Sequence, residues 1–146
     1  MRNAIVKMIS RHEGLRLDLY KCPADKWTIG YGRNLEDNGI REDEALLMLN
    51  NDIDQVLHEC QRAFDWFDRL DNPRQDVVLD MVFNLGLTRF RGFKKMIRAL
   101  SDGDYITAAE EMMDSRWAKQ VKTRAITLRQ IMITGEYPNW VYSSPD

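Results

Sequence analysis

The spacing of apolar residues changes period twice along this chain, and this change constrains the fold more than any other feature. From Arg2 to Glu13 apolar residues recur at helical spacing, and Gly14 is expected to end that helix. Within residues 15–31, bulky apolar residues alternate with polar residues or glycine, which is typical of strands. The helical period returns near Arg41 and persists through the rest of the chain. The pattern predicts an α+β fold in which a small antiparallel sheet lies between helices.

The sheet is expected to have two or three strands. Leucines alternate with polar residues over residues 15–20, and the sequence KCPADK then predicts a turn. Residues 27–32 form a second strand with one bulky face and one nearly bare face. The Asn38-Gly39 pair is a turn signal, which predicts a short third strand or a tight hairpin there.

The chain of 146 residues is predicted to form a single two-lobed domain over residues 1–146. The N-terminal lobe, about 12–50, carries the sheet. A long helix, about 41–63, connects it to a helical C-terminal lobe, about 64–146, on which the first helix is expected to pack. A cleft between two lobes is a common place for a ligand.

Composition excludes several classes of protein. Hydrophobic residues make up 44% of the chain and charged residues 30%, which argues against disorder and against a membrane-spanning chain. A net charge of -2 argues against a nucleic-acid-binding protein, for which only the cluster RFRGFKK offers a basic segment. Two cysteines are too few for a disulfide framework. His12 and His58 lie far apart with no cluster at metal-ligand spacing, so neither a metal nor another cofactor is expected.

Glu13 is a candidate general acid because of its position at the end of the first helix. The last carbonyl groups of a helix carry partial negative charge, which favours the protonated form of a nearby carboxyl group. Thr28 and Gly30 share the bare strand face, where a ligand could approach the backbone closely and the hydroxyl could hold a water or a sugar oxygen. An exposed glutamate and glycines at bulges in a twisted sheet explain the same residues without any function.

The segment EGLRLDLYKCPADKWTIGYG resembles the N-terminal signature of phage-type lysozymes, the endolysins of glycoside hydrolase family 24. Further similar segments follow in order: DEA and NNDID, MVFNLG, FRGFKKMIRAL, DSRW, TRA and TGEYP. Together they cover most of the chain. The signature has a glutamate, eight residues, a second catalytic position, five residues and a threonine, and this spacing selects Glu13, Cys22 and Thr28.

The resemblance implies a lysozyme-like fold and hydrolysis of the β-1,4 bond between N-acetylmuramic acid and N-acetylglucosamine in peptidoglycan. Glu13 would protonate the leaving oxygen, while Cys22 and Thr28 would orient the attacking water. Arg124 matches an arginine that approaches the catalytic glutamate from the second lobe, and Phe83 matches a residue that packs against a sugar ring.

Two positions differ from the usual family pattern. Where the family often has a histidine after the second strand, this chain has Arg33, and Asp52 on the long helix is its expected acidic partner. Position 22 is usually an aspartate, although members with cysteine are known. A neutral thiol is a poor base, because the reference pKa of cysteine is about 8.5.

Three roles for Cys22 stay open. Lys21 or Lys26 could favour its thiolate form, or the thiol could only position water through weak hydrogen bonds. Alternatively, Asp18 or Asp25 could supply the missing carboxylate. If none of these applies, the chain would be a catalytically weak peptidoglycan-binding or tail-associated module with the same fold.

The resemblance also implies partners and a location. The substrate would be the glycan strands of peptidoglycan, with no role for nucleic acid or metal, and the protein is expected to be a monomer. The N-terminus does not resemble a secretory signal, so the chain is expected in the cytoplasm of the bacterial host. It would then depend on a holin-like membrane-permeabilising protein to reach the wall.

Overall fold

A computed structural model describes residues 2–143. The chain forms two compact units, Met1–Leu49 and Asn50–Asp146. The predicted α+β fold is confirmed: the described residues form nine α-helices and one three-stranded antiparallel sheet. That residues 1–146 make one domain, with the first helix against the C-terminal lobe, stays a prediction. None of the described helices combines the length and the apolar character needed to cross a membrane.

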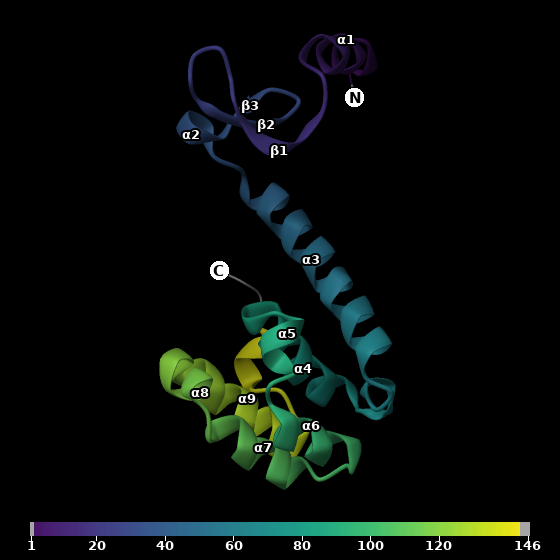
Figure 1. Cartoon of the computed structure of the whole chain (residues 1–146). Helices are drawn as coiled ribbons and strands as arrows, with labels where there is room; N and C mark the ends of the chain where they lie inside the picture. The colour runs from purple at the N-terminus through teal and green to yellow at the C-terminus, as the bar shows by residue number, and fades with distance from the viewer. Residues whose placement is uncertain (1, 144–146) are drawn as a thin grey trace. The chain divides into compact units, whose positions relative to one another are not determined.

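The first unit contains α1 (Asn3–Glu13), the sheet and a short helix (Figure 1). The strands β1 (Arg16–Lys21), β2 (Trp27–Gly30) and β3 (Arg33–Asn34) pair in that order. The register sets Tyr20 opposite Thr28 in β1 and β2. Helix α1 ends as predicted, because Gly14 adopts a φ of 73° and donates its N–H to the Ser10 carbonyl at 3.0 Å.

The third strand forms, but earlier in the chain than the turn signal indicated. Residues Leu35–Asn38 form α2, a single helical turn whose N-cap Asn34 accepts a hydrogen bond from the Asp37 N–H at 3.0 Å. Gly39 ends this turn with a φ of 59°. The Asn38-Gly39 pair therefore ends a helix, and the predicted hairpin at that pair is wrong. A glycine with positive φ is as favourable in a hairpin turn as at the end of a helix, so the sequence alone does not distinguish the two.

The long helix predicted from about Arg41 is confirmed as α3, which spans Glu42–Ala63 and continues from the first unit into the second. Its first turn carries three acidic residues, which are favourable at the positive end of the helix dipole.

The second unit is helical throughout. It contains η1 (Phe67–Arg69), α4 (Asn72–Leu85), α5 (Leu87–Phe90), α6 (Lys94–Ser101), α7 (Tyr105–Met113), α8 (Arg116–Val121), α9 (Thr123–Thr134) and η2 (Asn139–Tyr142). Helix α7 packs against both α6 and α9. Helix α4 begins at Asn72, and its N-cap Asp71 accepts from the Arg74 N–H at 3.0 Å.

The apolar core lies in the second unit. Aromatic side chains from the segment after α3 join this core: Phe64 stacks on Trp66 with ring centroids 4.7 Å apart, and Phe67 is completely buried. Four methionines fill the spaces between the helices and are also completely buried: Met81, Met96, Met112 and Met132.

Candidate active site

The carboxyl group of Glu13 lies close to a glycine in the turn between β2 and β3. Glu13 is the last residue of α1, and Gly32 follows strand β2 with a φ of 78°. A Cβ atom added at Gly32 would lie 2.5 Å from Oε2 and 2.9 Å from Cδ of Glu13, which is too close for any side chain. The absence of a side chain at Gly32 therefore makes room for the Glu13 carboxyl group.

Gly30, the last residue of β2, and Gly32, in the turn that follows it, thus have different surroundings. A Cβ atom at Gly30 would meet nothing within 4 Å, so a ligand could still approach the backbone there as predicted. The role of Gly32 was missed by sequence reasoning, because Glu13 is distant in sequence and no local pattern links the two residues. The only signal in the sequence was the glycine itself, because the strand pattern gives no reason for a residue without a side chain at position 32.

Cys22 and Thr28 are brought together by the hairpin that joins β1 to β2. The Cys22 N–H donates to the Lys26 carbonyl at 3.0 Å, and the Thr28 hydroxyl donates to the same oxygen at 2.8 Å. Thr28 is 2% exposed, whereas Cys22 is partly exposed. One carbonyl group therefore holds the backbone of Cys22 and the side chain of Thr28, the two residues that the sequence selected for the water-positioning side.

The hairpin also changes the acidity of the thiol. Hydrogen bonding from the backbone of Lys26 lowers the pKa of Cys22 below its ordinary value. Partial burial opposes this, and the backbone of Ala24 lowers the pKa further. The other cysteine behaves oppositely, because burial raises the pKa of Cys60 to about 12. The fold therefore favours a thiolate at position 22 and disfavours one at position 60.

The neighbouring lysines are held by carboxylates. The Lys26 Nζ lies 3.4 Å from a Glu36 carboxylate oxygen and 3.3 Å from one of Asp37. The Lys21 Nζ lies 3.8 Å from Asp25 Oδ1 and 4.4 Å from the centre of the Trp27 ring. Backbone dipoles thus act on the thiol more directly than either ammonium group does.

The two aspartates considered as substitutes for a second carboxylate are both exposed. Asp18 lies on β1, and Asp25 lies in the turn with a φ of 62°. The Asp25 N–H donates to the Cys22 carbonyl at 2.8 Å, while its side chain is 87% exposed and faces Lys21. Asp25 is therefore tied to the Cys22 turn by its backbone, with its carboxylate directed to a cation.

Phe83 and Arg124 belong to the second unit. Phe83 lies on α4 and is 44% exposed, so its ring is accessible to a ligand. Arg124 lies on α9, where its Nε donates to Asp80 Oδ1 at 2.7 Å and its Nη2 donates to the Asp80 carbonyl at 3.3 Å. Asp80 orients this guanidinium, a role that the sequence did not reveal.

The partner of Arg33 differs from the one expected. Arg33 Nη1 lies 2.5 Å from Glu44 Oε1, and the same carboxylate oxygen accepts the Arg41 N–H at 2.8 Å. Arg33 thus pairs with the first turn of α3, and the prediction of Asp52 as its partner is wrong. The Arg33 guanidinium lowers the pKa of Glu44 to about 2.

Comparisons with known proteins give a consistent picture. A family model described as phage lysozyme matches residues 10–130. An endolysin from Acyrthosiphon pisum secondary endosymbiont phage 1 is 35% identical over 116 residues, which cover 77% of this chain and 75% of that protein.

More distant relatives cover nearly the whole chain. The probable T4-type lysozyme 2 of Dictyostelium discoideum is 22% identical over 165 aligned positions, covering 92% of this chain and 96% of that protein. The pre-baseplate central spike protein Gp5 of Enterobacteria phage T4 is also 22% identical, covering 94% of this chain but 29% of the spike protein.

Proposed function

This chain belongs to the phage lysozyme family, and we propose that it hydrolyses the β-1,4 bond between N-acetylmuramic acid and N-acetylglucosamine in peptidoglycan. The family supports the broader class, a peptidoglycan hydrolase of the lysozyme type. The particular bond that is cut and the roles of the individual residues are what we propose here.

Glu13 is the proposed general acid, which donates a proton to the glycosidic oxygen as the bond to the leaving sugar breaks. A carboxylic acid in this role needs a fixed position relative to that oxygen. The close approach of the Glu13 carboxyl group to Gly32 supports the assignment, because it sets the carboxyl group of this exposed residue beside the turn that follows β2. This contact is the observation that carries the proposal.

Cys22 and Thr28 are proposed to hold the attacking water. The Thr28 hydroxyl gives its proton to the Lys26 carbonyl, which leaves its oxygen lone pairs to accept from a water. The lowered pKa of Cys22 makes a thiolate available at a lower pH than for an ordinary thiol, so the sulfur can accept a proton from that water. Gly30, Phe83 and Arg124 are proposed substrate-binding residues.

The decisive experiment compares the unchanged protein with Glu13→Gln on purified peptidoglycan. The unchanged protein is expected to release new reducing sugar ends, and the variant should lose at least about a hundredfold of that rate, the usual scale for general acid catalysis. Glu42→Gln, at an exposed position in the first turn of α3, is the matched control and should keep full activity. Equal rates for the position-13 variant and the unchanged protein would refute the proposal.

One comparison favours a second candidate function. The similarity to a phage spike protein fits a tail-associated module that binds the wall and cuts it weakly. Such a module would bind purified peptidoglycan equally well with glutamate or glutamine at position 13, and the unchanged protein would release reducing ends only at a very low rate.

A monomeric state and dependence on a holin-like protein stay predictions. Sedimentation would test the first. Expression in a bacterial host with and without a membrane-permeabilising protein would test the second, because lysis should require both proteins.

A further inference from the structure

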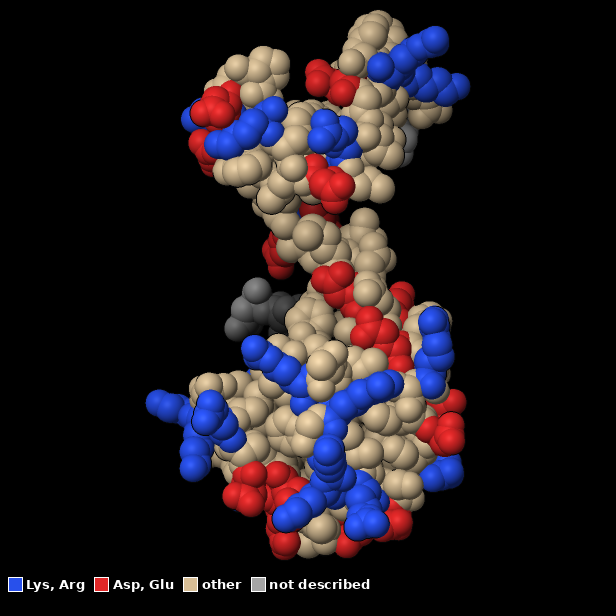
Figure 2. All heavy atoms as spheres, in the orientation of Figure 1, with Lys and Arg blue, Asp and Glu red and all other residues tan. Residues whose placement is uncertain are grey.

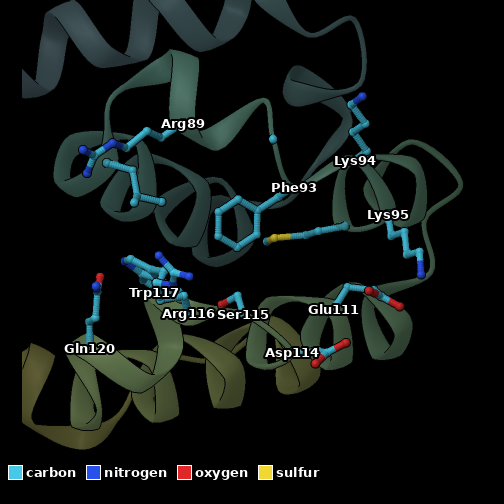
Figure 3. Close-up of a pocket in the computed structure, with 13 residues that line it drawn as sticks. Arg89, Phe93, Lys94, Lys95, Glu111, Asp114, Ser115, Arg116, Trp117 and Gln120 are labelled. Atoms are coloured by element: carbon cyan, nitrogen blue, oxygen red, sulfur yellow. The ribbon is translucent and has the colours of Figure 1, made fainter.

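Helix α7 lines both a pocket and a separate groove of the second unit. In the pocket, which α7 shares with α6 and α8, Glu111 lies beside Lys95 in the view of Figure 3. The groove lies between α7 and α9 and has a volume of about 450 Å³. None of the candidate catalytic or substrate-binding residues lines this groove, so the proposed reaction gives it no role. Its lining includes Ile106, Glu110, Met113, Asp114, Arg129 and Ile133.

The two helices beside the groove expose apolar side chains. On α9, Ile126 and Ile133 are seven residues apart and therefore share one face, and they are 53% and 38% exposed. On α7, Ile106 is 54% exposed, and Met113, also seven residues further on, is half-buried. The opposite face of each helix is buried in the core. Each helix thus carries a second apolar stripe, which is directed to solvent.

Each stripe also carries one charged residue between its apolar ends. On α7 this residue is Glu110, and on α9 it is Arg129. Both side chains line the groove and are exposed. Neither forms a salt bridge with another residue in the part of the chain that the structure describes. Because α7 and α9 pack against each other, one surface presents an acidic stripe next to a basic one.

A surface of this kind is complementary to a second copy of itself. In a dimer with two-fold symmetry the same patch is used by both copies, and every contact occurs twice. If α7 of one copy faces α9 of the other, Glu110 lies opposite Arg129 at both places. The isoleucines of α9 then form a ridge that packs into the groove of the other copy, as helices do inside proteins.

The basic surface of the second unit is not suited to such a contact. Residues 85–101, which form α5 and α6, contain five basic residues and no acidic one. Lys and Arg side chains form a band across this unit in Figure 2. Two copies that met through this band would place like charges opposite each other, which is unfavourable. The mixed charges beside the groove avoid this repulsion.

We infer that two copies of this chain associate through the α7–α9 surface, with Glu110 of each copy paired to Arg129 of the other. The surface is defined by Ile106, Glu110, Met113, Ile126, Arg129 and Ile133. Helix α9 has 12 residues and is about 18 Å long, so this patch is small for an interface between proteins, and the dimer should be reversible. The inference does not depend on the proposed function, and it opposes the monomeric state that the family resemblance implied.

Sedimentation equilibrium of the full chain at increasing concentration measures this association. The mean mass of the unchanged protein should rise from that of one chain toward that of two. Ile126→Lys should weaken the association at least about tenfold, because it places a charge in the apolar contact. Since Ile126 is exposed in the single chain, this variant should keep the melting temperature of the unchanged protein.

Charge reversal tests whether the proposed pair crosses between copies. Arg129→Glu alone and Glu110→Arg alone should each weaken the association at least about tenfold, since like charges would then face each other. An equimolar mixture of these two variants should associate as strongly as the unchanged protein, because a mixed dimer has opposite charges at both places. Pairing within one chain could not produce this recovery.

Arg98→Glu is the matched control, because it reverses an exposed charge on α6 that lies outside the α7–α9 surface. It should associate as the unchanged protein does. Equal association of Ile126→Lys and the unchanged protein, or no association in the mixture of the two charge variants, would overturn the proposal. A single-chain mass at every concentration would also overturn it, and binding to phosphatidylcholine vesicles that Ile126→Lys abolishes would then assign the surface to a membrane instead.

Discussion

The hydrogen atom that Gly32 carries in place of a side chain decides where the Glu13 carboxyl group can lie. Gly32→Ala would put a methyl group 2.5 Å from Glu13 Oε2, so the carboxyl group must move. A displacement of about 1 Å at a catalytic group can cost about a hundredfold in rate. We therefore expect this variant to lose about a hundredfold in the rate of reducing-end release from peptidoglycan.

A control must separate this displacement from backbone strain, because Gly32 has a positive φ. Gly39→Ala is suitable: its φ of 59° is also unfavourable for alanine, and its Cβ would meet nothing within 4 Å. Both variants should lower the melting temperature, but only Gly32→Ala should lose activity. Comparable activity losses would show that strain, and not the contact with Glu13, is responsible.

The ionisation of the thiol at position 22 should shape the pH dependence of activity. If the sulfur accepts a proton from the water, the reaction needs the thiolate together with a protonated Glu13, and the lowered pKa of Cys22 makes the thiolate available at lower pH than for an ordinary thiol. Cys22→Asp should shift the pH profile of the rate to lower pH, because aspartate has a reference pKa of about 3.9. The measurement is the pH dependence of reducing-end release.

Serine and alanine at position 22 test the base role further. Cys22→Ser should lose most activity at every pH, because a hydroxyl group is not ionised in this range. If Cys22→Ala retains the activity and pH profile of the unchanged protein, Cys22 takes no part in the reaction, and Asp18 or Asp25 becomes the candidate.

At the residue scale, the sequence identified the candidate catalytic residues better than it identified the groups that hold them in place. The spacing in the signature selected Cys22 and Thr28, but only the hairpin shows that one carbonyl group, that of Lys26, holds both. Asp80 and Gly32 were missed because each acts through a residue distant in the chain. Contacts of this kind depend on packing and leave no periodic signal.

At the scale of elements, the pair Arg33–Glu44 joins β3 to the first turn of α3 and should make stability depend on pH. The Arg33 guanidinium lowers the pKa of Glu44 from 4.5 to about 2 in the folded protein. A lowered carboxyl pKa stabilises the fold above the unfolded-state value, and this contribution is lost as pH falls from about 4.5 toward 2. Thermal unfolding measured across that window should therefore show a smaller loss in Glu44→Gln than in the unchanged protein.

The matched control is Glu42→Gln, on the same first turn of α3. Its pH dependence should equal that of the unchanged protein. The same pH dependence in Glu44→Gln and Glu42→Gln would show that the pair with Arg33 does not stabilise the native state.

The elements themselves were predicted well where they are long. Helix α3 was predicted over about 41–63 and spans Glu42–Ala63, because its apolar residues recur at helical spacing along its whole length. Helices α5 and α8 have four and six residues, too few to show a period, and were not predicted. The hairpin predicted at Asn38-Gly39 was wrong because this pair of residues is equally favourable in a hairpin turn and at the end of a helix.

At the scale of the whole molecule, the two units differ in how much apolar surface they bury. All the buried apolar side chains among the described residues lie between Cys60 and Met132. Among the described residues of the first unit, Thr28 is the only buried one, and Leu17 on β1 is 78% exposed. Burial of apolar surface is the main source of stability, so the second unit should carry most of it.

Amide hydrogen exchange of the full chain tests this distribution. Regions with few buried apolar contacts open with lower free energy than the global value, so the amides of β1 and β2 should exchange before those of α4, α7 and α9. Because Glu13, Cys22 and Thr28 all lie in the first unit, mild denaturant should then abolish hydrolysis before the tryptophan signal of the core changes. Equal protection of the sheet and the core helices, with both signals lost together, would show that the chain unfolds as one cooperative body and that the sheet shares the stability of the core.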